Sequence, residues 1–129
     1  MLKGCFEKMT LYLINTPVVL PADGIVYRVR KMSPDAAFVA LGDGFTSAIG
    51  HQGTVDVLKA IFPALSSQIT LNRIEIKEPS IQIVFKLKGR LPEGKVLDKD
   101  GIEAIGYEFW SVTPVKERID PAPQTKRFY

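Results

Sequence analysis

Strand-like and helix-like segments alternate along this chain, and this alternation limits the fold more than any other feature of the sequence. Residues 10–14 are a short apolar run bounded by turn-forming residues, which predicts a buried strand. Residues 25–30 alternate apolar and polar side chains, as a strand with one wet face does, and residues 45–49 form a third short strand. Helical spacing occupies residues 33–41 and 54–62. The first half of the chain therefore predicts an α/β fold.

The first predicted helix has clear start and stop signals. Ser33 is expected to cap it, Pro34 suits its first turn, and Asp35 complements the positive end of its dipole. The glycines of Gly42-Asp43-Gly44 are expected to end it. The second helix follows a predicted tight turn, Gly50-His51-Gln52-Gly53, and Pro63 closes it.

The second half predicts more strands than helices. Residues 72–77 alternate strictly and residues 81–87 form a longer β-like run, so both are predicted as strands. Asp98 is expected to start a short helix that ends at Gly106, and residues 107–112 form the last strand. We therefore predict a single α/β domain with one mixed β-sheet of about five strands flanked by helices.

The length of 129 residues fits one domain, and 46% hydrophobic and 24% charged residues are typical of a folded globular protein. We predict this domain over residues 9–114. Residues 1–8 are predicted to be an N-terminal extension, and residues 115–129, which are polar and rich in proline, a flexible tail.

Cysteine usage and hydropathy predict the compartment. Cys5 is the only cysteine, so no disulfide can form within the chain, as in a reducing compartment. No apolar run approaches the length of a membrane span, and Glu7 and Lys8 interrupt any signal-peptide core. We expect a cytoplasmic protein, in the host cytoplasm if a virus encodes it, with no membrane partner. The net charge of +3 suits a phosphate-bearing partner but is also common without one.

The residue inventory argues against several kinds of chemistry. There is one histidine and no paired carboxylates at metal-ligand spacing, so neither a metal site nor a cofactor is predicted. The chain lacks a nucleophile-elbow motif and the Gly-x-x-x-x-Gly-Lys loop that cradles phosphates. Composition alone leaves a Ser-His-Asp triad open.

His51, the only histidine, stands at the predicted start of the second helix. Free N–H groups and the positive end of the helix dipole attract phosphate at such a position. A bound phosphodiester would favour the protonated imidazole that a general acid needs to protonate a leaving 5′-oxygen. On spacing alone, a helix cap or a surface side chain is the commoner interpretation. Arg73, Arg90 and Glu93 are then ordinary solvated charges.

Four short motifs, in this order and spacing, raise the probability of catalysis. They are Ser47-Ala48-Ile49-Gly50-His51, Asn72-Arg73-Ile74-Glu75-Ile76, Gly89-Arg90-Leu91-Pro92-Glu93-Gly94-Lys95 and Ile105-Gly106-Tyr107-Glu108-Phe109. Through these motifs the sequence strongly resembles the small viral and mobile-element family of anti-CRISPR ring nucleases over roughly residues 9–112. The resemblance implies a homodimer that holds cyclic tetra-adenylate at its two-fold interface. It also implies metal-free cleavage to linear di-adenylates, which removes the signal of type III CRISPR systems.

The resemblance also implies site residues. His51 matches the general acid of the family, and Arg90 and Glu93 match its other catalytic residues. Arg73 matches an arginine that contacts phosphate or ribose, Asn15 matches the asparagine that ends the first strand, and Gly50 precedes the histidine. Thr16 is the nearest hydroxyl to the position where the family has a serine, which Pro17-Val18 replaces here.

The implied mechanism uses the 2′-hydroxyl of the ring as nucleophile, so the protein supplies orientation rather than an attacking group. Arg90, with Arg73, would stabilise charge on the phosphoryl oxygens, and His51 would protonate the departing 5′-oxygen. The immediate product would carry a 2′,3′-cyclic phosphate.

Two other functions fit the sequence. A dimeric regulatory or architectural protein could bind nucleic acid through Arg28, Arg30 and Lys31, although no recognition-helix signature is present and no stable DNA complex is expected. A sponge could bind the cyclic nucleotide without cutting it, with His51 as a contact only.

Overall fold

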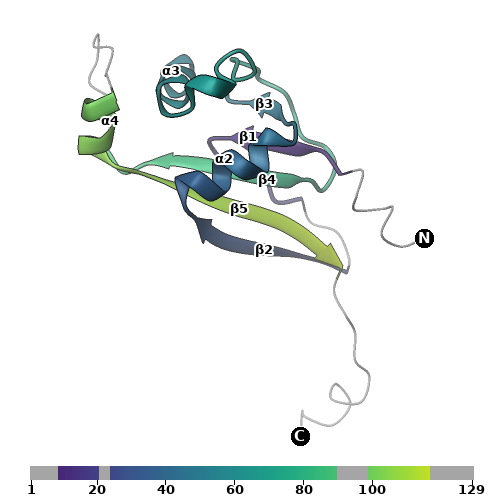
Figure 1. Cartoon of the computed structure of the whole chain (residues 1–129). Helices are drawn as coiled ribbons and strands as arrows, with labels where there is room; N and C mark the ends of the chain where they lie inside the picture. Colours follow the sequence, from purple (N-terminus) through teal and green to yellow (C-terminus); the bar gives the residue numbers. More distant parts are fainter. Residues whose placement is uncertain (1–8, 21–23, 90–98, 117–129) are drawn as a thin grey trace, which may run out of the picture.

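The computed structural model describes residues 9–20, 24–89 and 99–116 as a five-stranded mixed sheet with helices packed on it. The strands lie in the order β2-β5-β4-β1-β3 (Figure 1). Their bounds are Leu11–Ile14 for β1, Ile25–Met32 for β2, Thr46–Ala48 for β3, Ile81–Leu87 for β4 and Tyr107–Lys116 for β5. The helices are α2 (Pro34–Gly42), α3 (Gln52–Ile61), the 3₁₀ helix η1 (Pro63–Leu65) and α4 (Lys99–Ile105). The predicted mixed sheet of about five strands is confirmed.

The sheet has a parallel and an antiparallel part. Strand β1 pairs in parallel with both β3 and β4. Strand β5 pairs antiparallel with β4 on one side and with β2 on the other. Strands β1, β3 and β4 therefore point the same way, and their carboxyl ends lie at one edge of the sheet.

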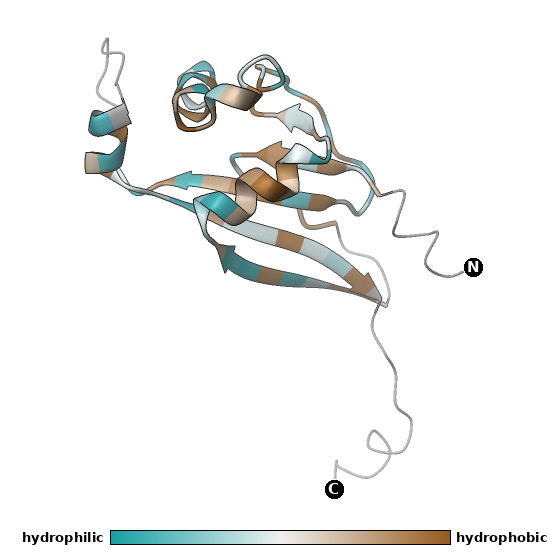
Figure 2. Ribbon diagram, viewed as in Figure 1, coloured by the Kyte–Doolittle hydropathy of each residue, from teal (hydrophilic) through white to brown (hydrophobic). Residues whose placement is uncertain are grey.

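The two faces of the sheet are covered differently. On one face, a core that includes Leu13, Ile83 and Phe109 packs against α2, α3 and α4. The other face carries a smaller cluster, which the segments after β1 and around Ile76 cover in part. Apolar and polar residues alternate along β2 (Figure 2), but most residues of this edge strand are exposed, so the one wet face that the sequence predicts is not seen. We call the second face the helix-free face; its members on the strands are Ile14, Ala48, Val84 and Val112.

Helix α2 starts as the sequence predicts. Ser33 adopts an extended backbone conformation, and its Oγ accepts a hydrogen bond of 3.1 Å from the N–H of Ala36. Pro34 is the first helical residue, and Asp35 lies in the first turn. After the helix, Gly44 has φ +112°, a conformation that glycine adopts without steric cost.

We expect Ser33→Ala to lower the free energy of unfolding by about 1 kcal/mol, because the N–H of Ala36 loses its acceptor. Urea denaturation monitored by circular dichroism measures this. Ser33→Asp keeps an acceptor at the cap and should stay close to wild type. An equal loss in both variants would show that the cap hydrogen bond contributes nothing.

Three boundaries differ from the prediction. Residues 72–77 form no strand, because the N–H of Ile74 bonds to the carbonyl of Asn72 at 3.1 Å and the resulting turn leads the chain away from β3. Gln52 and Gly53 belong to α3 rather than to a turn, because the helix continues to its cap at His51. Strand β5 runs to Lys116 rather than Val112, because Ile25 of β2 pairs with that residue. Residues 1–8 and 117–129 lie outside the described residues.

Candidate functional site

The carboxyl ends of the three parallel strands bring the candidate residues to one edge of the sheet. Asn15 and Thr16 follow β1 directly. Gly50 and His51 follow β3 by two and three positions and lead into α3. Open α/β sheets bind ligands outside the carboxyl ends of their parallel strands, because the loops that leave these strands meet there. The topology therefore places this edge first among candidate sites.

A cleft of about 530 Å³ lies at this edge. It gathers the four residues predicted to bind substrate, Asn15, Thr16, Gly50 and Arg73. Its remaining lining is apolar except for Glu75, and consists of Ile14, Val18, Ala48, Ile74, Glu75 and Ile76. A lining with both polar and apolar residues suits a ligand that carries both phosphates and bases.

Residues 70–76 form what we call the cleft wall, which carries Arg73. Hydrogen bonds to the end of β3 hold this wall in place. The buried Ser47 hydroxyl donates to the carbonyl of Thr70 at 2.5 Å and accepts from its N–H at 3.1 Å. The Asn72 side-chain amide donates to the carbonyl of Ser47 at 2.8 Å, and the Asn72 N–H donates to the carbonyl of Ile49 at 2.9 Å. These contacts hold residues 70–72 against β3 without a strand.

Arg73 projects from the turn that follows. Its Nε donates to the carbonyl of Gly50 at 3.0 Å, and the side chain is exposed. Within the described part of the chain this is the one hydrogen bond of the guanidinium. No other described residue occupies its two Nη atoms, which can donate to a phosphate.

His51 is the N-cap residue of α3, but its side chain does not cap the helix. The imidazole makes no capping hydrogen bond and is exposed, while the backbone carbonyl accepts from the N–H groups of Thr54 and Val55. The N–H groups of Gln52 and Gly53 donate to no other group among the described residues. Among the residues that the structure describes, the start of α3 therefore presents beside Gly50 an imidazole and backbone donors without hydrogen-bond partners. His51 itself is not part of the cleft lining.

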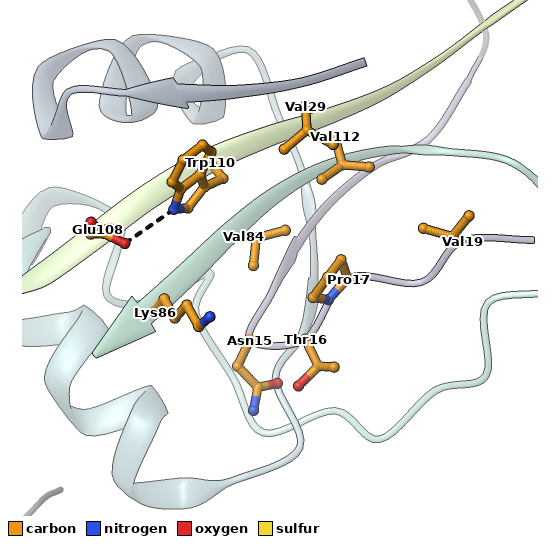
Figure 3. Close-up of a pocket in the computed structure, with 10 residues that line it drawn as sticks. All are labelled: Asn15, Thr16, Pro17, Val19, Val29, Val84, Lys86, Glu108, Trp110 and Val112. Atoms are coloured by element: carbon orange, nitrogen blue, oxygen red, sulfur yellow. Dashed lines mark hydrogen bonds between the residues drawn. The ribbon is translucent and has the colours of Figure 1, made fainter. Parts of the chain in front are cut away.

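Two further cavities join the cleft at Asn15, and sequence reasoning missed their other residues. One, of about 480 Å³, lies on the helix-free face and shares Asn15 and Thr16 with the cleft (Figure 3). The other, of about 160 Å³, is lined by Asn15, Thr54, Phe85, Lys86 and Leu87. It connects the end of β1 to the first turn of α3 and the end of β4. Lys86 lines both and adds a cation near Asn15.

A charged network borders the cavity on the helix-free face. The Nζ of Lys31 lies 3.2 Å from Oε2 of Glu108. The indole N–H of Trp110 donates to Oε1 of Glu108 at 3.3 Å (Figure 3). Hydrogen bonds from Lys31 and then from Trp110 lower the pKa of the Glu108 carboxyl. Glu108 is therefore an anion with two partners of its own.

Arg90 and Glu93 lie outside the described residues. Among residues 9–20, 24–89 and 99–116, no three histidine, cysteine, aspartate or glutamate side chains are grouped as metal ligands. Within the same residues, no helix is long and apolar enough to cross a bilayer.

Fold and site together define a small mixed α/β protein with a cleft of polar and apolar lining at the carboxyl ends of its parallel strands. A family model described as STIV B116-like matches residues 11–109. The chain therefore belongs to the STIV B116-like family of small viral proteins. Its fold is similar to that of B116 of Sulfolobus turreted icosahedral virus, with a TM-score of 0.65 and 22% sequence identity over 81% of this chain and 98% of that chain. A search of curated proteins finds no match.

Proposed function

We propose that the protein binds cyclic tetra-adenylate in this cleft and cleaves it to linear di-adenylates without a metal ion, which would silence type III CRISPR signalling. One observation carries the proposal. The cleft is lined by Asn15, Thr16, Gly50 and Arg73. His51 follows Gly50 directly, and its imidazole is exposed and makes no capping hydrogen bond. These residues come from separate segments of the chain, and the resemblance to ring nucleases singles out the same set.

The donors at this edge suit a phosphodiester. The Nη atoms of Arg73, the N–H groups of Gln52 and Gly53, and the Lys86 ammonium are hydrogen-bond donors. Glu75 is the acidic residue in the cleft lining, and its carboxylate can accept from a ligand hydroxyl or amino group. The site therefore offers partners for phosphates and for the polar groups of a nucleoside.

The proposed chemistry needs only a general acid and charge stabilisation. The ribose 2′-hydroxyl loses its proton to solvent water as its oxygen attacks the adjacent phosphorus, the bond from phosphorus to the 5′-oxygen breaks, and His51 protonates that oxygen. The products are a 2′,3′-cyclic phosphate and a 5′-hydroxyl. Arg73 stabilises charge on the phosphoryl oxygens, and the resemblance assigns Arg90 and Glu93 to the same catalytic centre.

A homodimer would supply the second half of the site. Cutting a four-nucleotide ring into two equal halves requires attack at two opposed bonds, and a two-fold axis would bring one His51 to each. The helix-free face offers an apolar surface for a second copy, since Val29 and Val19 are 57% and 58% exposed there. Contiguous exposed apolar surface of this kind marks interaction sites.

The test is incubation of the purified protein with cyclic tetra-adenylate in EDTA, with products identified by mass spectrometry and the oligomeric state by light scattering. We expect a dimer and linear di-adenylates that carry a 2′,3′-cyclic phosphate. A ring that stays bound but intact would favour the sponge. An intact, unbound ring together with salt-dependent binding to duplex DNA would favour the nucleic-acid-binding protein.

The structure gives the nucleic-acid alternative little support. In the pairing of β2 with β5, Lys31 lies opposite Trp110, whereas Arg28 and Arg30 lie opposite Thr113 and Ser111. Successive residues of a strand point to opposite faces, so Lys31 and the two arginines do not form one basic surface.

A further inference from the structure

The segment that leaves β1 lies on the helix-free face without pairing as a strand. Residues 17–20 have no regular secondary structure, although Val18 and Leu20 are half-buried against the second core cluster. Figure 3 shows Asn15, Thr16, Pro17 and Val19 along this segment. Buried backbone N–H and carbonyl groups need hydrogen-bond partners. Side chains supply them here.

Gln82 of β4 provides the first of these partners. Its side chain is fully buried, at 0% exposure, and lies 64 positions away from Val18 in the sequence. Its Oε1 accepts from the Val18 N–H at 2.8 Å, and its Nε2 donates to the Val18 carbonyl at 2.7 Å. This is the pair of bonds that a residue of a neighbouring strand would make. We call it the Gln82 clamp.

Tyr27 of β2 provides a weaker contact further along. Its hydroxyl accepts from the Leu20 N–H at 3.2 Å and donates to the Leu20 carbonyl at 3.3 Å. The two contacts act on one segment, but Val18 is only two residues beyond Thr16, whereas Leu20 is four. They therefore differ in how directly they restrain the residues at the cleft.

We propose that Gln82 is a positioning residue, which fixes Asn15 and Thr16 in the cleft by holding both backbone groups of Val18. Strand pairing fixes Ile14 on one side of these two residues, and the Gln82 clamp fixes Val18 on the other. Pro17 further restricts the conformation of the chain between Ile14 and Val18, because its ring locks φ. The inference rests on the proposed function, because it takes Asn15 and Thr16 to be contacts for the proposed substrate.

The chemistry of the clamp allows a sharp test. An amide offers one donor and one acceptor group to Val18, and a protonated carboxylic acid offers the same pair, but a carboxylate offers acceptors only. Gln82→Glu should therefore break the bond to the Val18 carbonyl when ionised and restore it when protonated. Burial favours the protonated form of a carboxyl group, so the change should fall in an accessible pH range.

The residues packed around Gln82 carry no group that would obscure the pH dependence of the Gln82→Glu variant. Its partners in the sheet are Tyr12 on β1 and Val112 on β5, and Val18 covers it. Tyr12 and Tyr27 carry phenols, not carboxyl, amino or imidazole groups. A change in the ratio of variant to wild type between about pH 5 and pH 8 would therefore report the new carboxyl group.

The experiment measures kcat and KM for cyclic tetra-adenylate with wild type, Gln82→Glu, Gln82→Leu and Tyr27→Phe. At pH 8 we expect KM to rise about tenfold in both Gln82 variants, roughly the effect of one unmade hydrogen bond in a buried site. Towards pH 5 the Gln82→Glu variant should approach wild type, whereas Gln82→Leu should not. Tyr27→Phe should stay within about twofold of wild type throughout. An unchanged KM in Gln82→Leu, or a Gln82→Glu ratio that does not vary with pH, would overturn the proposal.

The backbone amide NMR signals of Asn15 and Thr16, together with the side-chain amide signals of Asn15, give a second readout that needs no substrate. They should move with pH in Gln82→Glu and not in Tyr27→Phe. If the wild-type protein leaves the ring intact, the proposed function fails. The NMR signals then still decide whether Gln82 positions Asn15 and Thr16. Signals of Asn15 and Thr16 that match wild type in Gln82→Leu would contradict the positioning role.

Discussion

Replacing His51 with alanine is expected to slow cleavage of cyclic tetra-adenylate by about a hundredfold or more, the contribution typical of a general acid. Affinity for the ring should stay close to wild type. The imidazole is exposed, makes no capping hydrogen bond and lies outside the cleft lining, so its removal costs neither a helix cap nor a cleft contact. Single-turnover cleavage and calorimetric binding, measured in the same buffer with EDTA, separate the two effects.

Lys59→Ala is a matched control, because Lys59 is an exposed residue in the last turn of the same helix. It lines none of the cavities described above and should cleave at the wild-type rate. If His51→Ala cleaves as fast as the control, the proposed general acid is wrong. If it loses affinity and rate by the same factor, His51 is a ligand contact, as the sponge hypothesis requires.

Local patterns were sufficient to predict most of the fold. The signals at Ser33 and Pro34 located α2 because a helix start depends on neighbouring residues. The apolar runs at residues 81–87 and 107–112 located β4 and most of β5 for the same reason. The order of the strands was not predictable in this way, because β5 pairs with β2 across more than seventy intervening residues.

The segment at residues 72–77 shows where a local pattern fails. Its strict alternation is typical of a strand, but a strand also needs a neighbour with free backbone groups. Strand β3 is only three residues long, and the isolated bridge between Ile49 and Leu71 is the last pairing beyond it. The Asn72 side chain then bonds to the Ser47 carbonyl, and the turn at Arg73 follows. The segment that was predicted as a strand instead belongs to the cleft wall, from which Arg73 lines the cleft.

The candidate site was predictable where it depends on a single segment. His51 was expected at a helix start because the glycine-containing turn at residues 50–53 precedes helical spacing from residue 54, and the structure places it at the N-cap of α3. Lys86 and Thr54 were missed because they meet Asn15 only through the parallel register of β4 with β1 and the packing of α3. The Gln82 clamp was missed for a similar reason. Nothing near Gln82 in the sequence indicates that its partner is Val18.

Replacing Arg73 with alanine should weaken binding of cyclic tetra-adenylate by about tenfold to a hundredfold, the range for a lost charged hydrogen bond. The Nε bond to the Gly50 carbonyl holds the guanidinium at the cleft, and no hydrogen bond to another described residue prevents the Nη atoms from contacting phosphate. Arg73→Lys keeps the charge but not the planar fork that binds two oxygens at once, so its affinity should lie between alanine and wild type. Calorimetry at low and high salt measures this, and the loss should shrink as salt screens the charge.

Glu75→Gln gives the opposite change in charge within the same cleft. Removing a carboxylate that faces an anionic ligand should leave the affinity unchanged or raise it, provided that the carboxylate holds no ligand hydroxyl or amino group. The pair of variants therefore distinguishes electrostatics from damage to the wall. Arg73→Ala should weaken binding where Glu75→Gln does not. An Arg73→Ala protein that binds as tightly as wild type at low salt would remove Arg73 from the proposed phosphate contacts. The same loss of affinity in both variants would indicate that the substitutions disturb the packing of the cleft wall, residues 70–76, against β3.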